Sequence, residues 1–153
     1  MPSKNSATTS PMGVAQTCAA LHSRVFSRLI TRHYNNKLAS TGLRITQFSV
    51  MNAIKVFPPE SIHQLAEILG MERTSLQRTV EKLIDKGLLK SEPTGNRRSL
   101  GLSLTPEGEK IYLEALECWE EAHKEFTSMV GEENWAKTSK QLQGFSKRVK
   151  ETL

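Results

Sequence analysis

The chain has 153 residues, a formal net charge of +5 and a pI near 9.4. This length suits one domain with a sizeable buried core. No apolar run approaches the roughly 18 residues of a membrane span, and the polar start MPSKNSATTSPMG lacks the apolar segment of a secretory signal. Two cysteines, Cys18 and Cys118, are too few for a disulfide framework, so we expect a cytoplasmic protein with reduced thiols and no membrane partner.

The charge is unevenly distributed along the chain. Seven basic residues precede Glu60, the first acidic one, whereas nine glutamates and only two lysines lie between Glu107 and Glu133. A basic face favours a polyanionic partner. Solvated helix faces explain the same pattern, so charge alone does not decide between the two interpretations.

The first part of the chain predicts an arm and two helices. Residues 1–12, rich in Ser, Thr and Pro, predict a disordered arm before a single domain over 13–153. Apolar residues at three- and four-residue spacing predict a helix over about 14–40 that ends at Gly42; they are Leu21, Val25, Phe26, Leu29 and Ile30. Thr46 is expected to cap a second helix, which runs to Val56 with Phe48, Met51 and Ile54 inward.

Two short helices meeting at Gly70 follow. Ser61 is expected to cap the first, with Gln64 completing a capping-box pattern. Its apolar stripe is Ile62, Leu65, Ala66 and Leu69. The second is predicted over 73–86, and its inward residues are Leu76, Val80, Leu83 and Ile84.

A hairpin and two long helices complete the chain. LLKSE and LGLSL predict two short strands joined by PTGNRRS. Thr105 and Pro106 then begin a long helix, and a break near Gly131 precedes a last helix. The apolar side of that last helix comprises Trp135, Leu142, Phe145, Val149 and Leu153. The predicted fold is mainly α with a small β-wing: a winged helix-turn-helix over about 46–104, flanked by helices over about 14–40 and 106–153.

The 73–86 helix carries the candidate reading surface. Opposite its apolar stripe a helical wheel places Thr74, Ser75 and Arg78, with Gln77 and Thr79 at the borders. Such side chains read base edges in a major groove, where a recognition helix uses its N-terminal half. Arg78 is the main candidate for a base contact, and Arg73, at the helix start, for a phosphate contact. A merely solvated polar face is the alternative.

The turn between the strands favours the nucleic-acid interpretation. Arg97 and Arg98 are adjacent in TGNRRS, and arginines at a projecting tip suit a narrow, electronegative minor groove. Their alternative role is to keep the loop soluble. That alternative weakens because helix and tip belong to one winged unit.

With these residues in place, the chain resembles the MarR family of winged helix-turn-helix transcriptional regulators. The resemblance is carried by GLRITQFSVMNAI, IHQLAEILGMERTSLQRTVEKLIDKGLL and NRRSLGLSLTPEG. It implies a homodimer built by the first and last helices, which places two recognition helices on a pseudo-palindromic operator. It also implies Arg98 in the minor groove. The family's usual Asp two residues earlier is Asn96 here, which offers no charge pairing.

The residues also favour a dimer independently of the resemblance. Helix 14–40 and the last helix have apolar faces without an obvious partner in the small winged core, and a monomer would leave them exposed. The protein is therefore predicted to be a homodimeric, sequence-specific DNA-binding regulator and repressor. A winged-helix module that binds proteins instead is the alternative; it would more often carry aromatic anchors on this surface.

Control of such a regulator by thiol oxidation or by a small molecule is expected. Cys18 has His22 four residues later, and an imidazolium can lower a thiol pKa; a buried packing cysteine is the alternative. The resemblance implies an aromatic or anionic effector near basic residues, for which His22, Arg24 and Arg28 are candidates. The sequence contains no catalytic motif and no structural-zinc spacing, so we expect neither an enzyme, a cofactor nor a metal site.

Overall fold

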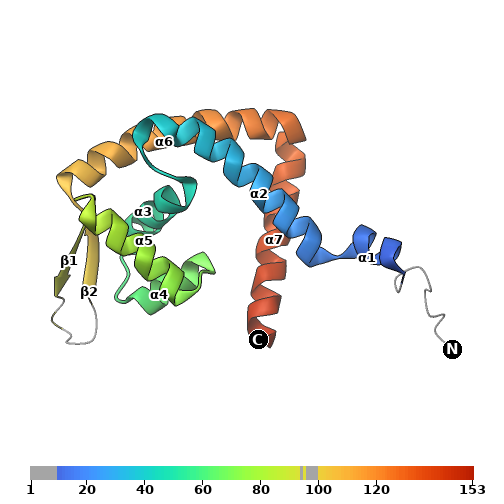
Figure 1. Cartoon of the computed structure of the whole chain (residues 1–153), viewed down its shortest axis with the longest axis horizontal. Helices are drawn as coiled ribbons and strands as arrows, with labels where there is room; N and C mark the ends of the chain where they lie inside the picture. The colour runs from blue at the N-terminus through green and yellow to red at the C-terminus, as the bar shows by residue number, and fades with distance from the viewer. Residues whose placement is uncertain (1–9, 94, 96–99) are drawn as a thin grey trace.

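The computed structural model describes residues 10–93, 95 and 100–153. Figure 1 shows an arch in which α2 and α6 lie along the top, the helix-turn-helix and its wing hang from one side, and α7 descends on the other. The elements are α1 (Pro11–Thr17), α2 (Ala19–Leu38), the 3₁₀ turn η1 (Ala39–Thr41), α3 (Ile45–Val56), α4 (Ile62–Leu69), α5 (Arg73–Asp85), β1 (Leu89–Pro93), β2 (Leu100–Leu104), α6 (Pro106–Val130) and α7 (Glu132–Thr152). The predicted mainly α fold with a two-stranded wing is confirmed.

The first helix differs from its prediction because it is broken at Cys18. This residue has an extended backbone (φ −68°, ψ 108°) and serves both as the C-cap of α1 and as the N-cap of α2. Upstream, α1 begins at Pro11, within the range predicted as an arm, and the Ser10 hydroxyl accepts a hydrogen bond from the Gly13 N–H at 3.0 Å. The single helix predicted from Val14 onward is therefore wrong. Periodicity of apolar residues cannot detect a one-residue interruption.

Helix α3 also begins differently, because tertiary contacts replace the expected Thr46 cap. The Ile45 N–H donates to Oδ1 of Asn35 at 2.8 Å, and the Arg44 N–H donates to Oε1 of Gln47 at 3.0 Å. The helix therefore starts before Thr46, whose side chain is exposed. The predicted inward residues of α3, which are Phe48, Met51 and Ile54, are all buried.

The helix-turn-helix packs into the main hydrophobic core of the chain, which it shares with α2, α3 and α6. Leu65 of α4 and Leu76 and Leu83 of α5 are fully buried, and they pack with α3 into one cluster. The Ser61 hydroxyl caps α4 by accepting the Gln64 N–H at 3.2 Å. The Gln64 side chain accepts from Glu60 rather than from Ser61, so the reciprocal contact is shifted by one residue from a strict capping box.

The wing is joined tightly to the start of α6. Antiparallel β1 and β2 pair from Leu89 opposite Leu104. The Thr105 hydroxyl donates to the Gly87 carbonyl at 2.6 Å and accepts from the Gly108 N–H at 3.0 Å. A Cβ at Gly108 would lie 2.0 Å from the Leu88 carbonyl oxygen. Only glycine allows α6 to approach the end of α5 so closely.

Helices α2 and α6 form the upper layer, held by a mixed aromatic and polar seam. The Tyr34 hydroxyl hydrogen-bonds Nδ1 of His123 at 2.9 Å, and the His33 Nε2 bonds the Ala122 carbonyl at 2.8 Å. The Trp119 ring stacks on His123 with centroids 4.7 Å apart. Burial raises the pKa of Tyr34. These contacts link α2 to α6 and both helices to the core beneath them.

Helix α7 makes its aromatic contacts with α2 and α6 near its beginning. Its Trp135 lies edge-on to Phe126 of α6 at 4.9 Å and near Phe26 of α2 at 6.3 Å. Farther along, the residues of its predicted apolar side, which are Leu142, Phe145, Val149 and Leu153, are exposed. In α2, Leu21, Val25, Phe26 and Leu29 are exposed too. A single chain thus leaves two apolar helix faces uncovered.

Candidate nucleic-acid interface

Helix α5 is mounted rigidly with its polar side outward. Leu76, Val80 and Leu83 anchor it in the core, and the turn before it passes through Gly70, whose φ of +62° is the left-handed conformation that glycine adopts freely. The Met71 N–H donates to the Ala66 carbonyl at 3.0 Å, which closes the end of α4. Packing therefore decides which side of α5 faces outward.

The predicted reading residues reach solvent from the N-terminal half of α5. Exposed side chains are those of Arg73, Thr74, Ser75, Gln77 and Arg78. Arg73 and Arg78 form no ion pair with any residue that the structure describes. Helix N-termini also carry partial positive charge. This end of α5 thus presents cations and hydroxyls without competing carboxylate partners.

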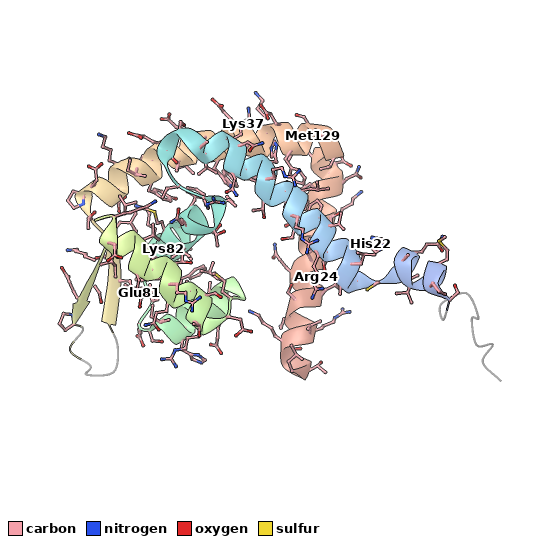
Figure 2. All side chains as sticks on the ribbon, viewed as in Figure 1. His22, Arg24, Lys37, Glu81, Lys82 and Met129 are labelled. Atoms are coloured by element: carbon pink, nitrogen blue, oxygen red, sulfur yellow. The ribbon has the colours of Figure 1, made fainter. Side chains whose placement is uncertain are left out.

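Two border residues are already engaged within the helix. The half-buried Thr79 donates its hydroxyl to the Ser75 carbonyl at 3.0 Å. The Gln77 amide donates to Oε1 of Glu81 at 3.0 Å, and Figure 2 labels Glu81 and Lys82 on α5. The Gln77 amide is held by its neighbour, whereas Arg78 carries no such restraint.

One predicted core position is wrong. Ile84 was expected to face inward, but 37% of its surface is exposed. It lines a cleft of about 410 Å³ between α5 and the wing, together with Gln77, Ser91 and Leu102. A wheel groups Ile84 with the inward residues, but the small wing sheet does not extend far enough to cover it.

Both arginines of the predicted wing tip, Arg97 and Arg98, lie outside the described residues, as does Asn96. The strands that carry the turn are described, and they project downward beside α5 in Figure 1. Recognition helix and wing therefore face the same side of the molecule, as a winged helix-turn-helix requires.

Known proteins resemble this chain in sequence and in fold. A family model for the MarR family matches residues 41–99, from the end of η1 to the wing. Over this segment, which is less than half of the chain, the sequence is similar to the MarR family.

Individual relatives are more distant. An uncharacterized HTH-type transcriptional regulator of Bacillus subtilis, YwoH, is 28% identical over 88 residues, which are 58% of this chain. The chain spans 64% of the length of that relative. The M. tuberculosis transcriptional regulator MosR, solved in complex with DNA, superposes with a TM-score of 0.80 at 26% identity, covering 89% of this chain and 98% of that one. A mutant MarR of E. coli complexed with operator DNA gives 0.78 at 19% identity, covering 89% and 99%.

The thiol candidate, Cys18, sits in a different environment from the expected one. Cys18 and Cys118 are both free and half-buried. Sγ of Cys18 accepts the Leu21 N–H at 3.4 Å, at the start of the 20-residue helix α2. Nε2 of His22 instead bonds the Gln16 carbonyl at 3.1 Å. The Cys18 sulfur is therefore contacted by the Leu21 amide rather than by His22, whose ring bonds a carbonyl of α1.

Of the three ligand-site candidates, Arg28 lines a described cleft. Arg28 lies in a basic cleft of about 500 Å³, whose other residues include Arg32, Asn35 and Arg44. His22 and Arg24 do not line it; Figure 2 places both at the N-terminal end of α2, on the opposite side of the view from Glu81. The structure therefore separates candidates that are close in sequence.

The sequence interpretation missed two basic residues near α5. Lys82 is exposed one turn beyond Arg78, and a complete wheel of the helix would have found it. Lys150 of α7 reaches the turn before α5 from 83 positions along the chain. No linear pattern could have indicated that contact.

Among the residues that the structure describes, no helix is long and apolar enough to span a membrane. Within the same residues, no three His, Cys, Asp or Glu side chains gather in a way that could hold a metal ion.

Proposed function

We propose that the protein is a sequence-specific DNA-binding transcriptional regulator, a repressor, that acts as a homodimer on a pseudo-palindromic operator. The carrying observation is the outward N-terminal half of α5, where Arg73 and Arg78 have no carboxylate partner among the described residues. Similarity to MosR, whose structure contains DNA, supports the proposal over almost the whole length of both chains.

In this proposal each residue type has its own task. Arg78, exposed in the first half of α5, contacts a base edge in the major groove, because a guanidinium matches the two acceptors of guanine. Arg73, at the helix start, contacts a phosphate. Thr74 and Ser75 add hydroxyl contacts, while Gln77 and Thr79 contribute at the border. Arg97 and Arg98 of the wing turn are proposed to enter the adjacent minor groove.

Dimerisation is proposed to bury the uncovered faces of α2 and α7. Phe145 and Val149 are each 56% exposed in the single chain. Association of two copies would remove such apolar surface from water, which favours the dimer by about 25 cal/mol per Å². Two-fold symmetry would then present two α5 helices about one turn of DNA apart.

Release is proposed to follow from an anionic or aromatic effector, or from oxidation of Cys18. The basic cleft that contains Arg28 supports the first route, because Arg28, Arg32 and Arg44 converge there. The second is supported by the position of Cys18 at the break between α1 and α2, where its half-buried Sγ accepts the Leu21 N–H. His22 and Arg24 remain effector candidates only if the dimer brings them to a site.

The test is binding to DNA from the protein's own promoter region, followed by fluorescence anisotropy at several salt concentrations. Arg78→Ala is expected to cost about 1–3 kcal/mol on the operator and to relax sequence preference. Arg98→Ala should weaken binding more evenly across sequences. Lys110→Ala removes the same charge at an exposed position of α6. It is the matched control and should bind like the parent. Unchanged operator preference in the Arg78 variant would refute this reading surface.

A further inference from the structure

Helix α7 and the helix-turn-helix are connected by a single long side chain. Nζ of Lys150 donates a hydrogen bond to the Glu67 carbonyl oxygen at 2.6 Å. Among residues 10–93, 95 and 100–153 this is the one hydrogen bond between α7 and the α4–α5 unit. Figure 1 shows the C-terminal end of α7 level with α4. The contact therefore joins α7, whose apolar side is exposed, to the α4–α5 unit.

The carbonyl that Lys150 contacts is well placed to orient α5. Glu67 lies in the last turn of α4, where carbonyls lack helical partners and carry the negative end of the helix dipole. The same carbonyl accepts the Gly70 N–H at 3.3 Å. The ammonium group thus sits on the turn that leads directly into Arg73, the first residue of α5.

Side-chain packing does not replace this hydrogen bond. A cleft of about 620 Å³ lies at the junction, lined by Lys150 and, from the other side, by Ala66, Gly70, Met71 and Arg73. The two surfaces are not in close apolar contact there, so the hydrogen bond is a direct link across the cleft, in addition to the core packing that holds the α4–α5 unit. A flexible four-carbon side chain that spans such a cleft is held in place by the bond it makes.

We propose that Lys150 is a positioning residue, which fixes the α4–α5 unit relative to α7 and so sets the half-site spacing that the dimer reads. The proposal rests on the proposed function for its DNA readout. If α7 belongs to the dimer interface, the distance between the two α5 helices depends on how each reading unit is held on its α7. Lys150 contributes to specificity in this way without touching DNA.

The test compares Lys150→Met, which keeps the side-chain length and loses the donor, with Lys147→Met. Lys147 lies on α7 one turn earlier, pairs with Glu151 at 4.0 Å and makes no hydrogen bond or ion pair to the described part of the α4–α5 unit. Both variants lose one positive charge, so any general weakening of DNA binding is matched. Lys150→Arg restores a donor at nearly the same reach.

Duplexes that differ only in half-site spacing, by one or two base pairs around about 10 bp, give the first readout. The parent and Lys147→Met should prefer one spacing by at least about tenfold, and Lys150→Met should bind all spacings within about threefold. Hydrogen–deuterium exchange of residues 66–72 without DNA gives the second, and should be several-fold faster in Lys150→Met alone.

The two readouts separate the failure of this inference from that of the proposed function. If the parent binds no duplex but exchange quickens only in Lys150→Met, the regulator proposal fails and the positioning of the α4–α5 unit by Lys150 stands. If the parent binds DNA while Lys150→Met keeps both its spacing preference and its slow exchange, Lys150 does not position the unit.

Discussion

The helices α3 to α5, here called the α3–α5 unit, and the helices α2 and α7 carry apolar residues at the same helical spacing. The single chain buries these residues in the α3–α5 unit and leaves many of them exposed on α2 and α7. Leu65, Leu76 and Leu83 are fully buried in the helix-turn-helix. Leu29 of α2 and Phe145 of α7 remain more than half exposed. The first unit is complete within one chain, whereas the second has an apolar face but no partner for it. The stability of the α3–α5 unit should therefore not depend on protein concentration, whereas the stability of α7 should depend on it.

The largest effect is expected from removing a core side chain of the reading unit. Leu76→Ala should lower the free energy of unfolding by about 2–5 kcal/mol, because it deletes a fully buried side chain and leaves a cavity. Ile84→Ala on the same helix should cost less than about 1 kcal/mol, since 37% of Ile84 is already exposed. Urea denaturation at two protein concentrations measures both. Equal costs would contradict the burial contrast.

A somewhat smaller effect is expected from a substitution in the exposed apolar faces of α2 and α7. Phe145→Asp should weaken the proposed dimer about 100-fold, or about 2.7 kcal/mol, by placing a charge in an apolar interface. Leu113→Asp, on an exposed position of α6, is the control and should leave the mass unchanged. Analytical ultracentrifugation over a dilution series separates the outcomes. A parent that sediments as one chain at high concentration would remove the proposed dimer altogether.

The same comparison explains how far sequence reasoning extends. The α3–α5 unit and the start of α6 were predicted well because local signals agree with packing there: Ser61 and Thr105 act as caps, and Gly70 ends α4. The start of α3 was not, because the Ile45 N–H is bonded by Asn35, ten positions away. Periodicity locates apolar faces but not what covers them, so the exposure of Ile84 was missed.

The candidate site divides in a similar way. The outward positions of α5 follow from the wheel, since Leu76 and Val80 fix which side is buried. Contacts between distant residues do not follow from any local pattern. Cys18 and His22 are four residues apart, but the helix breaks between α1 and α2, and the imidazole bonds Gln16. Lys150 and Glu67 illustrate the converse, a contact between segments far apart in sequence.

A cap at the junction of the two regions should have a moderate effect. The Thr105 hydroxyl bonds both the Gly87 carbonyl and the Gly108 N–H, so it ties the end of α5 to the start of α6. Thr105→Ala should cost about 0.5–2 kcal/mol of unfolding free energy. Thr105→Ser keeps the hydroxyl and should remain within about 0.5 kcal/mol of the parent in the same denaturation experiment. A serine variant as unstable as the alanine variant would assign the effect to the lost methyl group instead.

The smallest effect on stability is expected from substitution of Cys18, the residue at the start of α2 that is proposed to be oxidised. Cys18→Ser should change the unfolding free energy by less than about 0.5 kcal/mol, because serine is itself a good N-cap and can accept the Leu21 N–H. Its operator binding should match that of the parent under reducing conditions.

After mild hydrogen peroxide the two proteins should differ. In the parent, the Cys18 thiolate attacks one peroxide oxygen, the O–O bond breaks, hydroxide leaves and a sulfenic acid forms, so sulfur is oxidised and peroxide reduced. Mass spectrometry should locate the added oxygen at Cys18, and operator binding should fall. Cys118→Ser, which removes the other thiol, near Ser40, should still respond. Because a larger, polar group at the start of α2 would disturb the helix that lies beside Phe126 and Trp135, oxidation should act through the layer of α2 and α6 rather than through α5. Full oxidative release of the Cys18→Ser protein would exclude Cys18 from the switch.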